Sequence, residues 1–233
     1  MQRFYMPDQA MNEIIHVTDD GFFHQISRVL RSRIGDGVIL FNGDGFDREY
    51  RIEEITKKAI TLKKAKDYPL QSEMPRTVVL YQSLPNKYEK IEWIIEKWIE
   101  IGIHAFYFFR SEHSQKLMIT PKKEERFMTI AREALEQCEG SIMPEIRFLD
   151  TFDASYVQGE VFILDENGGK WLETPLQKQG VYTLFVGPEG GWSEKERALF
   201  EGSGYTRVQF GNRILRTETA AIALGFYFLH HKQ

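Results

Sequence analysis

Two glycine-rich turns carry the residues best suited to chemistry, and each turn directly follows a short β-type run. The first turn covers residues 187–192, and the second covers residues 211–216. Gly187, Gly190 and Gly191 permit positive φ and let a flat ligand approach the peptide groups, because no Cβ stands in the way. Loops at strand ends are the usual ligand sites of α/β layers. The two turns therefore predict a ligand site.

Three charged side chains, Arg213, Arg216 and Glu218, lie in or beside the second turn. Thr217 is predicted to cap a nearly wholly apolar helix that runs to about Leu229, and such a helix should be buried. Unpaired charge beside buried segments is costly, so these side chains need partners. A ligand site meets that need, and an ordinary turn stapled by one Arg–Glu pair meets it equally well.

The first turn is followed by a clear signal for the start of a helix. Ser193 and Glu196 have the spacing of a capping box, which predicts that a helix begins at Glu194. Taken alone, the glycines of this turn also fit a phosphate nest. The Gly-Lys-Ser/Thr ending of a P-loop is absent, so the turn does not match that nucleotide-binding motif.

The chain from Thr77 onward alternates strand patterns with helical patterns, which favours an α/β domain with a mostly parallel sheet. The predicted elements are strands at 78–81, 106–109, 145–149, 161–164, 182–186 and 206–210, and helices at 89–101 and from 121 onward. Three loops, at 165–169, 187–192 and 211–216, follow consecutive strands. An ordinary α/β sheet offers one ligand crevice, so three such loops are notable.

Residues 1–68 read as a small, mostly β module with one helix. The predicted elements are a helix at 21–33 and strands at 38–42, 47–56 and 59–66. Several short strands with one helix indicate a small barrel. A polar stretch with two prolines at 67–76 is the predicted linker, so we divide the chain into domains 1–72 and 73–233.

Arg28, Arg31 and Arg33 gather near His24 on the predicted helix of the first domain. Guanidinium groups pair bidentately with phosphate or with base edges, which indicates an RNA-binding surface. A solvated helix face is the alternative, and composition alone favours it. The net charge of −4 gives no support to a nucleic-acid partner, so any RNA contact depends on a local patch.

The remaining composition excludes several classes of site. The single cysteine, Cys138, excludes an internal disulfide and a multi-cysteine metal site. His104 and His113 lack the paired spacing of metal ligands, so no metal is expected. The amino terminus lacks the apolar core of a signal peptide, and no segment reaches the roughly 18 apolar residues of a membrane helix. We therefore expect a cytoplasmic protein without a membrane partner.

Four stretches of sequence together resemble one family. The two turns read Gly-Pro-Glu-Gly-Gly and Gly-Asn-Arg-Ile-Leu-Arg-Thr-Glu-Thr-Ala, and the start of the chain holds Arg-Phe-Tyr at 3–5 and His-Gln-Ile-Ser-Arg-Val-Leu-Arg at 24–31. These motifs resemble those of the RsmE-type 16S rRNA (uracil-N3)-methyltransferases of the SPOUT superfamily. The resemblance implies a trefoil-knotted SPOUT domain preceded by a small PUA-like β-barrel. Knots are rare, and hydrophobic periodicity does not reveal one.

The resemblance also implies a cofactor, a substrate and an assembly. It implies S-adenosyl-L-methionine held mainly by backbone, 16S rRNA as substrate within the 30S subunit, and a homodimer whose active site lies at the subunit contact. The implied cofactor-binding residues are Leu164, Gly187, Glu189, Gly190, Gly191, Gly211, Ile214 and Leu215. The implied RNA-binding residues are Arg3, His24, Arg28 and Arg31. Residues 136–141 and 165–169 depart from the family pattern, which weakens inference about how RNA is held.

Methylation at uracil N3 requires that the N3 proton leave, because the protonated nitrogen is a poor nucleophile. Some group must accept that proton or stabilise the anion on the flanking carbonyl oxygens. By elimination from the loops, Arg216 is the candidate for anion stabilisation, and Glu218 for orienting Arg216 or taking the proton. Two other functions stay open: the same knot with a different RNA acceptor, such as a ribose or another base, and a non-catalytic RNA-binding assembly factor.

Overall fold

The computed structural model describes residues 1–69, 75–167, 170–171 and 176–231. The chain divides into two compact units. The first contains residues 1–73 together with residues 135–143, and the second contains residues 74–134 and 144–233. Among the described residues, no helix has both the length and the apolar character needed to span a membrane.

The first unit is built on a mixed five-stranded sheet with the order β1-β3-β4-β5-β2. Its strands are β1 (Gln2–Tyr5), β2 (Ile14–Val17), β3 (Gly37–Phe41), β4 (Phe46–Ile55) and β5 (Ile60–Pro69). β1 runs parallel to β3, and the other neighbours are antiparallel. The three predicted strands are confirmed, whereas β1 and β2 were not predicted. β5 continues through Asp67 to Pro69, so the first part of the predicted linker is strand.

The helix predicted at 21–33 is shorter and less regular than expected. α1 (Asp20–His24) begins after Asp19, whose side chain accepts a 2.7 Å hydrogen bond from the Phe22 backbone N–H. It continues directly as a π-helical segment, η1 (Gln25–Val29). Phe22 and Ile26 are its buried side chains and join the core of the first unit, so a narrow apolar stripe fixes this element.

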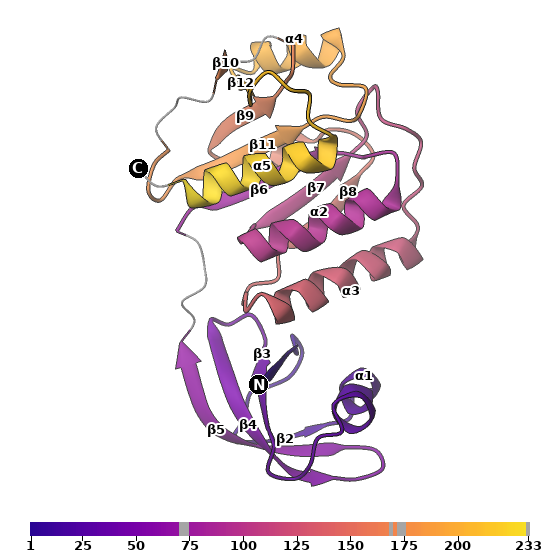
Figure 1. The fold of residues 1–233 in the computed structure, drawn as a ribbon, viewed down its shortest axis with the longest axis vertical. Helices are drawn as coiled ribbons and strands as arrows, with labels where there is room; N and C mark the ends of the chain where they lie inside the picture. The colour runs from indigo at the N-terminus through magenta and orange to yellow at the C-terminus, as the bar shows by residue number, and fades with distance from the viewer. Residues whose placement is uncertain (70–74, 168–169, 172–175, 232–233) are drawn as a thin grey trace. The chain divides into compact units, whose positions relative to one another are not determined.

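The second unit contains a seven-stranded parallel sheet with the order β10-β12-β9-β11-β6-β7-β8 (Figure 1). Its strands are β6 (Thr77–Ser83), β7 (Ala105–Phe109), β8 (Glu145–Leu149), β9 (Glu160–Leu164), β10 (Lys170–Trp171), β11 (Val181–Val186) and β12 (Thr206–Gln209). The six predicted strands are all present, within two residues at each end, and β10 is an addition.

The helices follow the predicted pattern closely. They are α2 (Tyr88–Ile101), α3 (Pro121–Gln137), α4 (Glu194–Gly202) and α5 (Thr217–His230), with a short 3-10 helix, η2 (Ala154–Tyr156). Gly102 ends α2 in a left-handed conformation with φ 94°, as its glycine predicted. The predicted capping box is confirmed, because the Ser193 hydroxyl and the Glu196 carboxylate exchange hydrogen bonds with each other's backbone N–H.

Helices α2 and α5 lie side by side over one face of the sheet (Figure 1). Gly225 of α5 makes this packing possible, because a Cβ there would lie 2.7 Å from the buried ring of Trp98 on α2. A separate aromatic cluster, which includes Tyr81, Phe185 and Trp192, forms a second part of the core. β9, β11 and β12 are therefore held between packed layers, and their carboxyl ends meet at one edge of the sheet.

Candidate functional site

One pocket of about 520 Å³ lies at the carboxyl ends of β9, β11 and β12. Its walls come from the three loops that the sequence placed after consecutive strands. The lining residues are Leu164–Glu166, Val186–Glu189, Gly191, Trp192, Gln209–Thr217 and Ala220. The volume falls in the range of small-molecule sites. The three loops therefore line one pocket.

The structure brings seven of the eight predicted cofactor residues to this pocket. The seven are Leu164, Gly187, Glu189, Gly191, Gly211, Ile214 and Leu215. Gly190 is not among the lining residues. It packs instead against His113 from the segment after β7, with 3.2 Å between the His113 Nδ1 and the Gly190 carbonyl oxygen. A Cβ at position 190 would lie 3.0 Å from the His113 Cβ, so the absence of a side chain on Gly190 allows this close packing.

The first glycine turn is fixed by a buried tryptophan. Trp192 donates a 2.9 Å hydrogen bond from its indole N–H to the Leu164 carbonyl oxygen at the end of β9. A Cβ on Gly187 would lie 3.2 Å from the same indole ring. Gly191 has a φ of 67°, a conformation that favours glycine. The indole thus links the loop after β11 to the end of β9, where the loop at 165–169 begins.

Thr217 has a different role from the predicted one. Arg216 occupies the N-cap position of α5 and makes no side-chain cap hydrogen bond, so the prediction that Thr217 caps this helix is wrong. The Thr217 hydroxyl instead donates a 2.6 Å hydrogen bond to the Gly187 carbonyl oxygen and accepts one of 3.0 Å from the Gln82 amide. Gln82 is fully buried at the end of β6. The loops after β11 and β12 are therefore connected to each other and to β6 through these hydrogen bonds.

The two predicted catalytic residues are close in sequence but have different surroundings. Arg216 is exposed and lines the pocket. Glu218 forms its ion pair with Lys90 of α2, at 3.4 Å, and not with Arg216 among the described contacts. Side chains two positions apart at a helix start do not face each other, which explains why the expected Arg–Glu pair is not formed. The prediction that Glu218 orients Arg216 is corrected accordingly.

Lys90 was not identified from the sequence. Its ammonium lies 2.6 Å from Glu189 of the first glycine turn, and the Asn86 backbone N–H donates to the same carboxylate oxygen at 3.2 Å. Burial raises the pKa of Glu189. The hydrogen bond from Lys90, the backbone N–H groups of Glu189 itself and of Asn86, and the charge of Lys90 together outweigh burial and hold that pKa below its usual range. Burial lowers the pKa of Lys90, and Glu189 and Glu218 together raise it above its usual value.

Asp165, at the end of β9, was also missed. Its carboxylate is buried and forms ion pairs with Arg197 of α4 and Arg207 of β12, both at 2.9 Å. It also accepts a 2.9 Å hydrogen bond from the Asn167 backbone N–H. This carboxylate braces the loop after β9 against α4 and β12. Residues 168 and 169 of this loop lie outside the described residues.

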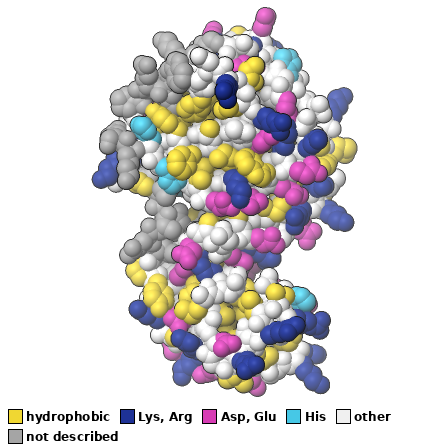
Figure 2. Space-filling model, viewed as in Figure 1, with side chains coloured by type: hydrophobic (Ala, Val, Ile, Leu, Met, Phe, Trp, Pro, Cys, Tyr) yellow, Lys and Arg dark blue, Asp and Glu magenta, His cyan; other side chains and the backbone are white. Residues whose placement is uncertain are grey.

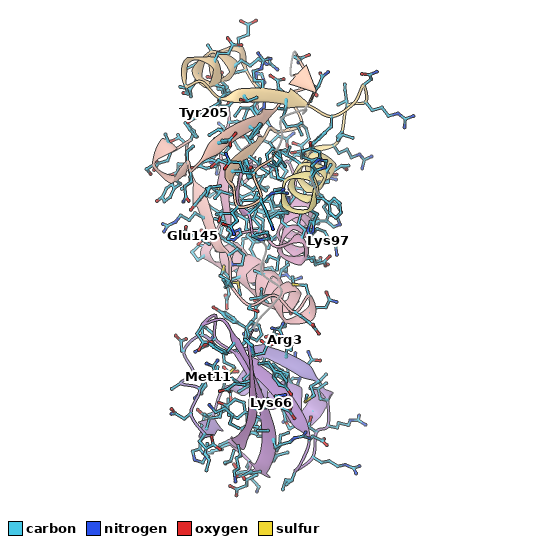
Figure 3. All side chains as sticks on the ribbon, turned by 90° about the vertical axis from the view of Figure 1, so that its left-hand side faces the viewer. Arg3, Met11, Lys66, Lys97, Glu145 and Tyr205 are labelled. Carbon is cyan, nitrogen blue, oxygen red and sulfur yellow. The ribbon has the colours of Figure 1, made fainter. Side chains whose placement is uncertain are left out.

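The predicted RNA contacts divide into an exposed group and a buried residue. His24, Arg28 and Arg31 are exposed on α1, η1 and the turn that follows. Arg3 is buried (Figure 3), and its guanidinium makes two hydrogen bonds to Asp47, at 2.8 and 2.9 Å. It also donates to the carbonyl oxygens of Leu135 and Gly140. The structure therefore corrects the prediction for Arg3, whose donors stabilise the first unit.

Comparison with known families matches both parts of the chain. A family model described as an RNA methyltransferase domain matches residues 72–227, and one described as an RNA methyltransferase PUA domain matches residues 17–65. Among individual relatives, Ribosomal RNA small subunit methyltransferase E of Bacillus subtilis is 31% identical over 220 residues, covering 85% of this chain and 83% of the relative. The protein of the same name from Buchnera aphidicola (Acyrthosiphon pisum) is 28% identical, covering 94% and 89%.

A solved structure resembles the whole chain. The crystal structure of a Ribosomal RNA small subunit methyltransferase E from Neisseria gonorrhoeae, bound to S-adenosyl methionine, superposes with a TM-score of 0.87. The two sequences are 26% identical, and the match covers 98% of each chain. The match therefore covers both units.

Proposed function

This chain belongs to the RNA methyltransferase family, and from that premise we propose that it transfers a methyl group from S-adenosylmethionine to N3 of a uridine in 16S rRNA. The observation that carries the proposal is the single pocket formed by three loops, which holds seven of the eight residues that the motifs assigned to the cofactor.

The residues of the pocket fit this cofactor. The glycines leave open peptide groups, and at Gly187 a Cβ would crowd the Trp192 ring at 3.2 Å. Leu164, Ile214 and Leu215 supply apolar contacts for an adenosine group, while the main chain of the glycine turns supplies donors and acceptors. When bound, the cofactor supplies a methyl group on a sulfonium, which is already activated for transfer to a nucleophile. The protein's task is then to orient the acceptor.

Arg216 is the proposed catalytic cation. Its side chain is exposed at the pocket, where a guanidinium can stabilise negative charge on a uracil carbonyl as N3 loses its proton. Glu218 is the proposed proton acceptor. It lies in the first turn of α5 beside Arg216, and its buried Oε2 atom is 3.4 Å from the Lys90 ammonium.

His24, Arg28 and Arg31 are the proposed RNA contacts of the first unit. Their exposure leaves the guanidinium and imidazole groups available to phosphates. Arg3 is not included, because Asp47 and two carbonyl oxygens occupy its donors. We propose that the target lies in the 30S subunit, which places the enzyme in the cytoplasm.

The proposed assembly is a homodimer. Figure 2 shows hydrophobic side chains gathered on one face of the second unit. Trp93 of α2 and Phe226 of α5 are large hydrophobic side chains that are exposed. Large apolar side chains on neighbouring helices are typical of surfaces that pack against another protein. Sedimentation of the purified protein tests this proposal, and a monomer at micromolar concentration would contradict it.

Two measurements test the proposed reaction. Calorimetry of the purified protein with S-adenosylmethionine should show binding without RNA, and an absence of binding would remove the methyltransferase proposal. Mass mapping of 16S rRNA from cells that lack this protein should show one uridine without its N3 methyl group. Loss of a methyl group from a ribose or from another base would instead establish the alternative acceptor.

A further inference from the structure

Lys90 lies where two walls of the pocket meet. It projects from the first turn of α2, and its ammonium contacts Glu189 at 2.6 Å and Glu218 at 3.4 Å. Glu189 belongs to the loop after β11, and Glu218 belongs to the first turn of α5. The two carboxylates are 29 positions apart in the chain, yet one cation contacts both.

The side chains of all three residues are mostly buried, with exposed fractions of 21% for Lys90, 31% for Glu189 and 16% for Glu218. Water therefore screens this cluster less than it screens a surface pair. The charged groups that act on Lys90 are these two carboxylates. The Gln82–Thr217–Gly187 hydrogen bonds also link the loop after β11 to the start of α5.

We infer that Lys90 is a positioning residue for methyl transfer: its ammonium holds Glu189 and Glu218 together and so sets the spacing of the two loops that enclose the methyl donor. The inference rests on the proposed function. Lys90 is not among the residues that line the pocket. It acts through Glu189, which lines the pocket, and through the helix start that carries Arg216 and Glu218.

Removal of the cation should make the pocket sensitive to pH. Without the ammonium, two carboxylates lie close together in a partly buried region with no cation between them. Repulsion between their charges then raises the pKa of one of them. At low pH that carboxylate is protonated and the loops stay close. As pH increases, both carboxylates ionise and repel each other, and the loops separate. If Lys90 contributed only to stability, its removal would lower the free energy of unfolding without making the pocket sensitive to pH.

The test compares K90M, K90R and K97M. Lys97 is the matched control, because it lies on the same helix (Figure 3) and is also held by two carboxylates, Glu96 at 2.7 Å and Glu100 at 2.8 Å. The dissociation constant for S-adenosylmethionine is measured by calorimetry from pH 6 to pH 8. For K90M, affinity should fall roughly tenfold across this range, about the effect of one charge-assisted hydrogen bond. Wild type, K90R and K97M should show no such fall.

A second measurement needs no cofactor. Hydrogen exchange of the backbone amides at 187, 189–192 and 217–220 should be faster in K90M than in K97M, and the difference should grow with pH after correction for the intrinsic rate. An affinity for K90M that stays level or rises with pH overturns the inference, as does equal exchange in both variants. Failure of wild type to bind S-adenosylmethionine removes the proposed function instead, and the exchange result then still decides the role of Lys90.

Discussion

The Thr217 hydroxyl donates a 2.6 Å hydrogen bond to the Gly187 carbonyl oxygen, 30 residues earlier in the chain. This contact joins the first turn of α5 to the glycine turn after β11, and the Gln82 amide completes it from β6. Two of the three pocket loops therefore depend on one buried hydroxyl group. A threonine that the sequence suggests as a helix cap is in fact a connection between loops.

Replacement of Thr217 by valine should weaken cofactor binding. T217V leaves the Gly187 carbonyl oxygen and the Gln82 amide without this partner, and an unsatisfied buried polar group costs about 1–3 kcal/mol. The affinity for S-adenosylmethionine, measured by calorimetry, should fall by roughly tenfold or more. T217S keeps the hydroxyl and should bind within about threefold of wild type. Equal affinities for T217V and T217S would show that the hydrogen bond does not shape the pocket.

Alanine at Gly191 should impair the pocket more than alanine at Gly204. Both glycines have positive φ, 67° and 72°, so each substitution should cost about 1–2 kcal/mol of stability. A Cβ on Gly191 would lie 3.2 Å from the Glu166 carboxylate at the pocket, whereas a Cβ on Gly204 meets nothing within 4 Å. G191A should therefore lose affinity for S-adenosylmethionine, and G204A should keep it. Similar affinities for the two variants would contradict this assignment.

Removal of the Asp165 charge should destabilise the second unit. D165N leaves Arg197 and Arg207 beside a buried neutral amide, and breaking a buried ion pair costs about 3 kcal/mol. The control is E201Q, because Glu201 is the exposed partner of Arg207 and should contribute less than about 1 kcal/mol. Urea unfolding of both variants measures the difference. A D165N midpoint equal to that of E201Q would mean that the network does not brace the loop.

Substitutions in the first unit should separate RNA binding from stability. R28A should lower the slope of log affinity against log salt by about one, because one phosphate contact is lost. R3M should leave that slope unchanged. It should lower the unfolding temperature, because it removes the hydrogen bonds from the Arg3 guanidinium to Asp47 and to two backbone carbonyl oxygens. Filter binding to rRNA fragments at several salt concentrations measures the slope, and thermal unfolding measures the unfolding temperature. A changed slope for R3M would restore Arg3 as an RNA contact.

The Glu189–Lys90 pair should make stability depend on acid pH. The pKa of Glu189 is lowered in the folded state, so its contribution is present above the unfolded pKa and is lost as pH falls through the folded pKa. Wild type should therefore be more stable than E189Q at pH 6, and the difference should shrink as pH is lowered to 3. Urea titrations across this range measure it. A difference that does not change with pH would exclude an ionic contribution.

Much of the fold follows from local sequence patterns. The second unit's strands have strong apolar runs, and its helices carry clear start and stop signals, such as the capping box at Ser193 and the glycine at 102. The predicted fold class, a SPOUT-type α/β domain with a PUA-like module, is confirmed by the family and structural matches. The three pocket loops were predictable because parallel strands end at a common edge.

The partners of the charged side chains were not predictable in the same way. Lys90 and Lys97 have the same side chain on the same helix, and only the tertiary fold places Glu189 and Glu218 beside one of them. Arg3 belongs to a family motif and was predicted to contact RNA, yet the fold buries it against Asp47. Periodicity reports which side of an element is apolar, and it contains no information on which distant residue a charge meets.

Residues 135–143 are synthesised after the rest of the first unit, which ends at residue 73. They complete the first compact unit, and the carbonyl oxygens of Leu135 and Gly140 accept hydrogen bonds from Arg3 near the start of the chain. A gene fragment that stops at residue 72 would encode a module that lacks these acceptors. On the ribosome, Arg3 can donate to these two carbonyl oxygens only after residue 140 has emerged, although the last strand of the sheet that carries Arg3 ends at Pro69.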